Sequence, residues 1–487
     1  MAVSKIATLL LVVVATMVSR GEAARPNIVF ILTDDQAPWA IGVSGNPLAK
    51  TPHMDRIARE GVYLPNAYTV TPVCSPSRAA LMTSRYGSEL GITDWIHPRR
   101  EPELGLDAKL PIWPRQLQKA GYHTGLVGKW HLGRQDSQHP TRYGFDHFMG
   151  HRQGGWSPVN PTLEQNRKPH KFQGLTADVL ADEAMRFVRD HVASSPQRPF
   201  LLCWHTRAPH ARWLPVAPED MAPYKGKDIE IPNPDYPLLD IPRVKRMTRE
   251  YLASVRSVDR NVGRLLGLLD RLKLAENTIV IFTSDHGYNM GHNGIWHKGN
   301  GHWVLKQAPR ATANIPRGQR PNMYDNSIKV PTMIRWPGVI KPGTVMKHTV
   351  SNLDWFPTIL SMAGLKPDPG WKIRGRDFSP WLKGIKLRTI WRNEYFAEYS
   401  THHQSKTHMR MLSDGLFKLV RDFHDRSRDE FYDLTNDPAE SKNLIHSKDP
   451  KIKLTIEYLH QELVDRMESH GDQVHMGKTA PRANGTR

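Results

Sequence analysis

Cys74 stands in a polar stretch that contains serine and proline and ends at Arg78. The chain has one other cysteine, Cys203, within the apolar run Pro199–Trp204, where a small buried side chain is expected. Two cysteines are too few for a fold held together by disulfides. Cys74 is therefore either an exposed, unmodified thiol or a reactive group with a chemical task.

Three aspartates follow predicted strands. Asp34 and Asp35 come directly after the apolar, β-branched run Asn27–Thr33, and Asp285 follows the similar run Thr278–Ser284. In open α/β sheets, ligands bind in the crevice beyond the carboxyl ends of the strands. An isolated Asp-Asp pair is more often a turn or a helix cap. Three carboxylates at one sheet edge suit a hard cation such as calcium, which takes roughly six to eight oxygens.

The rest of the pattern predicts strands alternating with helices. Further strands are expected at Pro199–Trp204 and Thr124–Val127, and helices at Thr51–Glu60, Thr176–Ala193 and Thr248–Leu274. This alternation predicts an α/β fold with a large mixed, mainly parallel sheet flanked by helices.

The pattern changes after Gly384. Short strands are predicted at Asn393–Ser400, His408–Leu412, Phe417–Val420 and Glu430–Leu434, and a closing helix at Ile452–Met467. We expect a small C-terminal antiparallel sheet plus helix, followed by a polar tail. The predicted divisions are a signal peptide (1–23), a catalytic domain (24–384) and a smaller C-terminal domain (385–487).

The N-terminal segment is typical of an export signal. Lys5 supplies a positive charge, Ile6–Val18 is apolar, and Gly21 and Ala23 are small residues suited to a cleavage site. The apolar run is shorter than the roughly 20 residues that span a bilayer, which argues against an anchor. We expect the mature chain to have no membrane span and to be periplasmic or secreted.

The chain is strongly basic. Its 487 residues carry a formal net charge of +19 with histidine neutral. No nucleic-acid motif accompanies this charge, and export argues against a genomic partner. A sulfated polysaccharide would be attracted by the same field, although general solvation explains the charge equally well.

The segment Cys74–Arg78 and several others resemble the type I sulfatases, the formylglycine-dependent branch of the alkaline-phosphatase-like superfamily. The resemblance runs from about Pro26 to Leu444. The other segments that carry it are Asp34-Asp35, Gly128–Gly133, Pro209-His210, Thr283–Gly287, Gly294–Gly299, Tyr324–Pro331, Arg335–Gly338 and Tyr432–Leu444.

This resemblance implies that Cys74 is oxidised to formylglycine by a formylglycine-generating enzyme. One hydroxyl of the hydrated aldehyde would attack sulfur and the other would later expel sulfate. The resemblance also implies one calcium ion, held by Asp34, Asp35, Asp285, His286 and the group made from Cys74. His286 is the unusual ligand, because imidazole is softer than the ligands that calcium prefers.

The resemblance also implies roles for five basic residues. Arg78 and Lys129 would hold the formylglycine, and His131 would be the base when sulfate is expelled. His210 and Lys298 would bind sulfate oxygens or protonate the leaving oxygen. We expect Lys129 and His131 to alternate along one extended segment and so to face the same side. The sequence leaves open which residue protonates the leaving group.

One segment departs from the family pattern. A long basic stretch, Gly299–Met323, separates Lys298 from Tyr324, where many members have a much shorter link. The residues Tyr324–Ser327 also differ from the more usual Tyr-Glu-Gly-Gly. The insertion puts the role of Lys298 in question, and is either a wall of the substrate pocket or a variable surface loop.

Two other functions compete with a sulfatase. A phosphate or phosphonate ester hydrolase of the same superfamily would share the strand-end carboxylates but would commonly use two zinc ions. A non-catalytic binder of sulfated glycans would use only the basic surface. The substrate, a sulfated small molecule or a polysaccharide, is not set by the sequence, and we expect specificity in the loops His97–Glu101 and His151–Trp156 and in the insertion.

Overall fold

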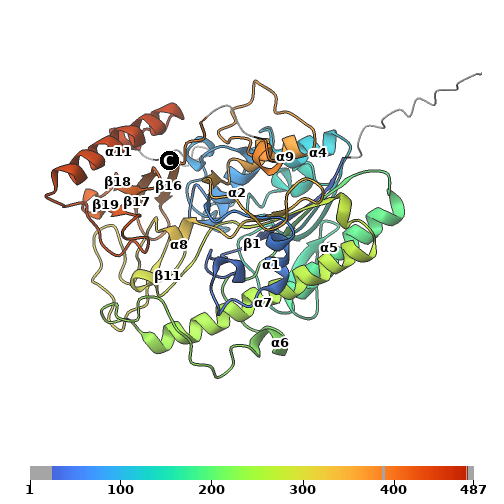
Figure 1. The fold of residues 1–487 in the computed structure, drawn as a ribbon, viewed down its shortest axis with the longest axis horizontal. Coiled ribbons are helices and arrows are strands. Elements are labelled where there is room, and N and C mark those ends of the chain that lie inside the picture. The colour runs from blue at the N-terminus through green and yellow to red at the C-terminus, as the bar shows by residue number, and fades with distance from the viewer. Residues whose placement is uncertain (1–24, 386–389, 479, 481–487) are drawn as a thin grey trace, which may run out of the picture.

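A mixed β-sheet runs through the centre of the molecule (Figure 1). The computed structural model describes residues 25–385, 390–478 and 480, so the predicted signal peptide lies outside the described part. The order of the ten strands is β14-β2-β13-β9-β1-β8-β4-β5-β6-β7. Their bounds are β1 Asn27–Thr33, β2 Val62–Tyr63, β4 His123–Lys129, β5 His147–His151, β6 Thr162–Gln165, β7 Lys168–Lys171, β8 Phe200–His205, β9 Thr278–Ser284, β13 Met333–Arg335 and β14 Thr344–Val345.

The central strands of this sheet are parallel. β1 lies between β8 and β9 and is parallel to both, and β4 is parallel to β8 and β5. Antiparallel strands β13, β6 and β7 extend the sheet towards its edges. The carboxyl ends of β1, β8, β4 and β9 therefore lie along the same side of the sheet, where residues that follow them can meet.

Helices cover both faces of the sheet. Along β1, Val29 and Ile31 pack on one face, whereas Ile28, Phe30 and Leu32 pack on the other, as the two-residue period of a strand requires. The first face is covered by α1 (Pro52–Arg59), α5 (Thr176–Ser194) and α7 (Ile241–Arg271), and the second by α2 (Cys74–Thr83), α4 (Trp113–Lys119) and α9 (Trp355–Met362).

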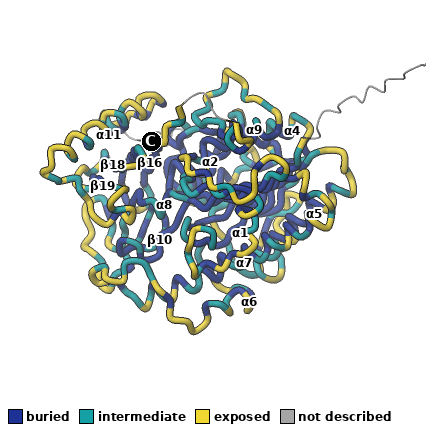
Figure 2. Tube along the Cα trace, in the orientation of Figure 1, coloured by how far each residue is buried: buried dark blue, intermediate teal, exposed yellow. Residues whose placement is uncertain are grey.

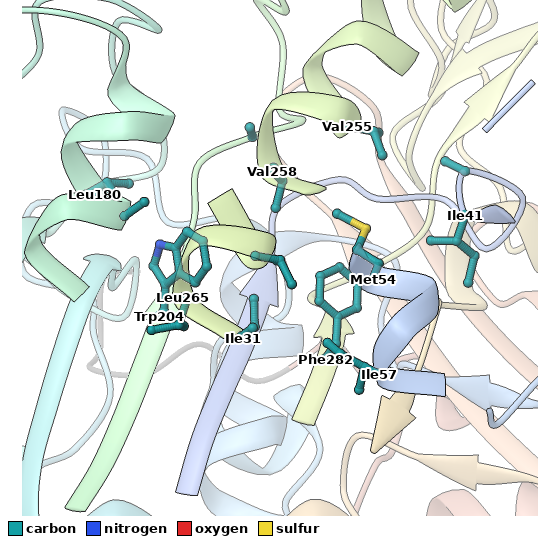
Figure 3. Packing of buried hydrophobic residues seen from close by; sticks show 14 of the residues in the cluster. Ile31, Ile41, Met54, Ile57, Leu180, Trp204, Val255, Val258, Leu265 and Phe282 are labelled. Atoms are coloured by element: carbon teal, nitrogen blue, oxygen red, sulfur yellow. The ribbon is translucent and has the colours of Figure 1, made fainter. Parts of the chain in front are cut away.

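Close packing joins the sheet to its helices. Figure 3 shows Ile31, Trp204 and Phe282 of three strands in one apolar cluster with Leu265 of α7 and Ile57 of α1. The central strands of the sheet lie in the buried interior of the molecule, while the edge strand β7, the outer faces of α11 and the surface loops are exposed (Figure 2). A sheet buried on both faces explains why its strands read as continuous apolar runs.

A smaller antiparallel sheet follows in the chain. Its strands pair in sequence order, and α11 packs against them on the left of Figure 1. The bounds are β16 Tyr395–Thr401, β17 Thr407–Ser413, β18 Phe417–Asp422, β19 Glu430–Asp433 and α11 Pro450–Ser469. The predicted fold class is confirmed: a large, mainly parallel sheet flanked by helices, with a small C-terminal antiparallel sheet plus helix.

Most predicted elements agree closely with the structure. β1 and β9 have the predicted bounds, and β8 is displaced by one residue. The largest error is at α7, which begins at Ile241 rather than Thr248. The side chain of Asp240 accepts a hydrogen bond from the backbone N–H of Arg243, and Pro242 stands in the first turn. An aspartate cap and a proline in the first turn are ordinary signals for the start of a helix. The prediction missed them because the first turns of α7 are polar and lack the apolar periodicity on which it relied.

None of the helices in the described residues combines the length and the apolar character that a membrane span requires.

Candidate active site

Neighbouring parallel strands bring three aspartates together. Asp34 and Asp35 follow β1, and Asp285 and His286 follow β9. The backbone N–H of Asp35 donates to Asp285 Oδ1 at 3.2 Å, and the N–H of Asp285 donates to the carbonyl of Thr33 at 3.0 Å. All three carboxylates are buried. The predicted convergence of these residues is present in the structure.

Cys74 is the first residue of α2 and faces these carboxylates. Its Sγ lies 3.7 Å from Asp34 Oδ1 and 3.4 Å from His286 Nε2, and Lys298 Nζ lies 3.0 Å away. Only 3 % of Cys74 is exposed, so the alternative of an exposed thiol is wrong. Cys203, the other cysteine, is fully buried in β8 among apolar side chains, as predicted.

Each of the three carboxylates forms one buried ion pair. The pairs are Lys129 Nζ with Asp34 Oδ2 at 2.7 Å, Lys298 Nζ with Asp35 Oδ1 at 2.7 Å, and Arg78 Nε with Asp285 Oδ2 at 2.8 Å. Pairing offsets the cost of burying six charges. One oxygen of each carboxylate remains outside these pairs, and Asp35 Oδ2 is buried with no hydrogen-bond partner among the described residues.

The field of the cations favours an anion at the position of Cys74. Burial by itself raises the pKa of the Cys74 thiol, but Lys129, Lys298 and His131 outweigh burial and hold it well below its usual range. The same balance acts on Asp35, where burial is outweighed by Lys298 and His210 and the pKa is lowered. The site is therefore built to hold negative charge.

His286 tests whether this site fits a metal ion. Its Nδ1 lies 3.0 Å from the carbonyl oxygen of Gly287, so Nδ1 carries the proton and Nε2 points into the site. Nε2 lies 3.1 Å from Asp35 Oδ1, 3.4 Å from Asp285 Oδ1 and 3.4 Å from Cys74 Sγ. An unprotonated Nε2 would face three electron-rich atoms, so it needs either a proton or a cation there.

The protonated alternative is reflected in the pKa of His286. Burial lowers this pKa, but Asp285 and Asp35 outweigh it and raise it to about 10. A divalent cation would satisfy the same three atoms, and the carboxylate oxygens outside the ion pairs are the donors that calcium prefers. The residues therefore fit the metal site that the sequence predicts, with His286 as one candidate ligand.

His131 lies beside Cys74 but not as predicted. β4 ends at Lys129, and His131 has a left-handed backbone with φ of 57°, so the extended segment expected through both residues is wrong. Its Nε2 lies 3.3 Å from the carbonyl oxygen of Ile96, and its Nδ1 is buried without a partner among the described residues. Burial lowers the pKa of His131 to about 4. A neutral ring with an available Nδ1 can accept a proton.

His210 borders the carboxylates from the loop after β8. A ring nitrogen lies within 4.8 Å of carboxylate oxygens of Asp34 and Asp35. Nδ1 lies 2.6 Å from the carbonyl oxygen of Ala211, and burial lowers the pKa of His210 to about 3. Arg207, which the sequence did not indicate, donates to the same carbonyl at 2.7 Å and so fixes this loop.

His205 was also missed. It is the last residue of β8, 1 % exposed, and its Nδ1 lies 3.1 Å from the carbonyl oxygen of Lys129. The signal that could have found it is the one that found Asp34, a polar residue at the carboxyl end of a buried strand.

The two ends of the insertion that follows Lys298, at Gly299 and Asn322, lie side by side. The backbone N–H of Gly299 donates to the carbonyl of Pro72, and the N–H of Asn322 donates to the carbonyl of Gly299 at 2.8 Å. The amide side chain of Asn322 also donates to the carbonyl of Lys298 at 3.1 Å. The long insertion therefore leaves Lys298 beside Asp35.

Gly128 permits the close approach of β4 and β8, and we expect alanine there to destabilise the fold. Its φ is 114°, and a Cβ would lie 1.8 Å from the carbonyl oxygen of His205. Gly121 is a matched control, because its φ is 96° but nothing lies within 4 Å of its Cβ position. Gly121→Ala should cost about 1–2 kcal/mol from the backbone alone, and Gly128→Ala clearly more. Chemical denaturation measures both, and equal losses would contradict the steric argument.

Two protein-family models match this chain, and both describe sulfatases or sulphohydrolases. The model of the family described as Sulfatase matches residues 26–365. A second model, described as N-sulphoglucosamine sulphohydrolase, C-terminal, matches residues 319–469.

Characterised relatives are similar over most of the chain. An N-acetylglucosamine-6-O-sulfatase of Bacteroides thetaiotaomicron is 28% identical, over 87% of this chain and 83% of the relative. The human N-acetylgalactosamine-6-sulfatase is 30% identical, over 75% of this chain and 67% of the relative. An ulvan-active sulfatase of Formosa agariphila is 31% identical, over 76% and 67% respectively.

Solved structures share the fold. A protein solved in complex with its substrate D-glucosamine-2-N,6-O-disulfate has a TM-score of 0.77 and 26% identity, over 92% of this chain and 98% of that one. The phosphonate monoester hydrolase of Agrobacterium radiobacter has a TM-score of 0.70 over 92% and 97%, but at 20% identity this likeness concerns the fold alone.

Proposed function

Because this chain belongs to the sulfatase family and is a sulfuric ester hydrolase, we propose that it removes sulfate from a sulfated carbohydrate, using a formylglycine made from Cys74 and one calcium ion. The observation that carries the proposal is the position of Cys74 at the start of α2, between Lys298 and the strand-end carboxylates. The carbohydrate substrate is supported by relatives named for sulfated amino sugars and for ulvan.

The environment of residue 74 suits an anionic nucleophile. The hydrate of formylglycine would supply two hydroxyls on one carbon: one would attack sulfur, and the other would lose its proton as the aldehyde re-forms and sulfate leaves. Lys129 and Lys298 place positive charge beside this position, which lowers the cost of negative charge there. Arg78, a member of the same motif, donates to Asp285 and to the carbonyl of Lys129, and so ties α2 to the ends of β9 and β4.

The candidate ligands of the calcium ion are Asp34, Asp35, Asp285 and His286, with the group made from Cys74. Calcium would neutralise substrate sulfate and acidify a bound hydroxyl. The unpartnered Asp35 Oδ2 and the inward-facing Nε2 of His286 support this ligand set.

The basic residues of the site fall into two groups, those that are neutral near pH 7 and those that are charged. His131 has a pKa lowered to about 4, so it is neutral near pH 7 and is the proposed base for sulfate expulsion. Lys298 keeps its proton, because Asp35 outweighs burial and raises its pKa. We therefore assign Lys298 to charge neutralisation at sulfate or at the leaving oxygen. His210, on the same side as Asp35, would contact sulfate oxygens.

Export and maturation belong to the same proposal. The segment 1–23 is the proposed signal peptide, 24–384 the catalytic domain and 385–487 the C-terminal domain, with the mature protein periplasmic or secreted. A formylglycine-generating enzyme is the proposed partner during maturation. The sequence pattern of Lys5 to Ala23 supports the export step, and the motif Cys74–Arg78 supports the maturation step.

A substrate panel tests the proposed function. Purified protein is assayed for release of sulfate from sulfated amino sugars and 4-nitrophenyl sulfate, and of phosphate or phosphonate from matched esters. Metal content is measured in parallel, and the peptide containing residue 74 is examined by mass spectrometry. We expect sulfate release, one calcium ion and an aldehyde in place of the thiol. Preferred cleavage of phosphonate esters with two zinc ions would favour the rival hydrolase, and glycan binding without turnover would favour the non-catalytic binder.

A further inference from the structure

The loop 94–101 touches the reaction centre through its backbone. The N–H of Ile96 donates to Ser75 Oγ at 3.0 Å, and the carbonyl of Ile96 lies 3.3 Å from His131 Nε2. Ser75 directly follows Cys74. Trp95 and His97 therefore flank the residue through which this loop contacts the site.

Two histidines from the C-terminal sheet complete a cluster with this loop. His402 and His403 stand in the turn between β16 and β17, about three hundred positions further along the chain. The ring centroid of Trp95 lies 4.6 Å from that of His403 and 4.9 Å from that of His97. Trp95 and His97 are partly exposed, whereas only 5 % of the His403 side chain is exposed, so the aromatic surface that the cluster offers belongs mainly to Trp95 and His97, on the loop that contacts Ser75.

Glu101 fixes the orientation of the two turn histidines. Its Oε1 lies 2.7 Å from His402 Nε2, and its Oε2 lies 3.2 Å from His403 Nε2 and accepts from the N–H of His97. Burial raises the pKa of Glu101, but its hydrogen bonds with His402 and His403 outweigh burial and lower the pKa. The carboxylate is therefore ionised; it orders the imidazoles of His402 and His403 and holds the backbone of His97.

His97 is left with a donor that the protein does not use. Its Nδ1 accepts from the backbone N–H of Arg99 at 3.1 Å and of Arg100 at 3.2 Å, so the neutral ring carries its proton on Nε2. Burial and the neighbouring His403 lower the pKa of His97, which keeps the ring neutral. Nε2 makes no hydrogen bond with any described residue.

The insertion braces the turn that carries these histidines. The N–H of Lys406 donates to the carbonyl of Asn314 at 2.9 Å, and the side chain of Gln319 hydrogen-bonds to Gln404 and to Ser405. Residues 402–406 are thus held between the loop 94–101 and the insertion. An ordered subsite needs such support, because mobile side chains lose entropy when a ligand binds.

We propose that Trp95 and His97 form the subsite for the sugar ring that carries the scissile sulfate, that His403 supports both rings, and that Glu101 positions His402 and His403. Aromatic faces suit the C–H surface of a sugar, and a neutral N–H donor suits a hydroxyl or amide oxygen. This inference rests on the proposed function, because it concerns the same reaction. It distinguishes a carbohydrate sulfate from a small aryl sulfate, which has no hydroxyls to recognise.

The test compares two substrates in matched variants. His97→Ala removes the donor, and His97→Gln restores an N–H of similar reach. Losing one neutral hydrogen bond worth about 1–1.5 kcal/mol should raise KM for N-acetylglucosamine 6-sulfate roughly tenfold. KM and kcat for 4-nitrophenyl sulfate should stay within about twofold, the scatter expected for a residue outside the chemical step. His446→Ala, an exposed histidine, is the control and should change neither.

Glu101→Gln should also raise KM for the sugar sulfate with little change in kcat, since it disturbs binding and not chemistry. Equal losses on both substrates would overturn the proposal by placing His97 in catalysis. Unchanged KM for every sulfated sugar on the panel would overturn it by removing His97 from the subsite. A wild-type protein that cleaves no sulfated sugar would instead contradict the proposed function.

Discussion

Replacing Cys74 with alanine is expected to abolish sulfate release while leaving the protein folded. Loss of a catalytic nucleophile should lower kcat by at least about 10⁴-fold, because the remaining groups can only bind and polarise the ester. The side chain is small and contacts mainly charged groups, so little apolar packing is lost. Cys74→Ser should permit at most one turnover per molecule, since a serine lacks the second hydroxyl. Release of alcohol and of sulfate is measured separately.

Cys203→Ala is the matched control for this variant. Cys203 is fully buried in β8 and packs with apolar neighbours, so its loss should lower the melting temperature but preserve kcat. Full activity in Cys74→Ala, or in wild-type protein whose Cys74 thiol is intact, would rule out formylglycine at this position.

Asp285→Asn is expected to remove metal-dependent activity and metal-dependent stability together. A ligand bound only by the native state at about 100 times its Kd adds about 2.7 kcal/mol of stability. Calcium should therefore raise the melting temperature of chelator-treated wild-type protein, and fail to do so in the variant. The variant also leaves Arg78 without its buried carboxylate partner, so its metal-free stability should fall as well. The informative quantity is the increment on adding calcium, measured by calorimetry.

Asp354→Asn controls for the loss of any buried carboxylate. Asp354 is buried and accepts from the N–H groups of Ser351 and Arg376, but it lies outside the candidate metal cluster. Asp354→Asn should have a lower melting temperature than the wild-type protein, but calcium should still raise that temperature by the wild-type amount. An unchanged increment in Asp285→Asn would mean that calcium binds elsewhere. A larger increment with zinc than with calcium would mean that the donor set does not select a hard cation.

The sequence predicted those parts of the fold and of the candidate site that depend on short local patterns. β1 and β9 were predicted with their bounds because strands buried on both faces are continuously apolar, and the position of Asp34, Asp35 and Asp285 followed from the geometry of parallel strands. Cys74 could be identified from the five-residue family motif that it opens. Each of these signals is contained in a few consecutive residues, so a single sequence is enough to recognise it.

Features that depend on distant contacts could not be predicted. The left-handed backbone of His131 gives no pattern in the sequence, although the nearby glycine motif was recognised. The pairing of Lys129 with Asp34 rather than with Asp285 depends on side-chain packing at the ends of β4 and β1, which β8 separates in the sheet. The meeting of Glu101 with His402 spans 301 positions, and sequence patterning carries no record of which loops meet.

Because the insertion is closed by hydrogen bonds between Gly299 and Asn322, its length and sequence can vary during evolution. Since both ends meet at one point, residues between them can be lengthened, shortened or exchanged with little strain on Lys298. The loop braces the turn that holds His402 and His403, so its replacement would alter which glycans are accepted while sparing the chemistry. A single scaffold could in this way be diversified towards new sulfated polymers by recombining one segment.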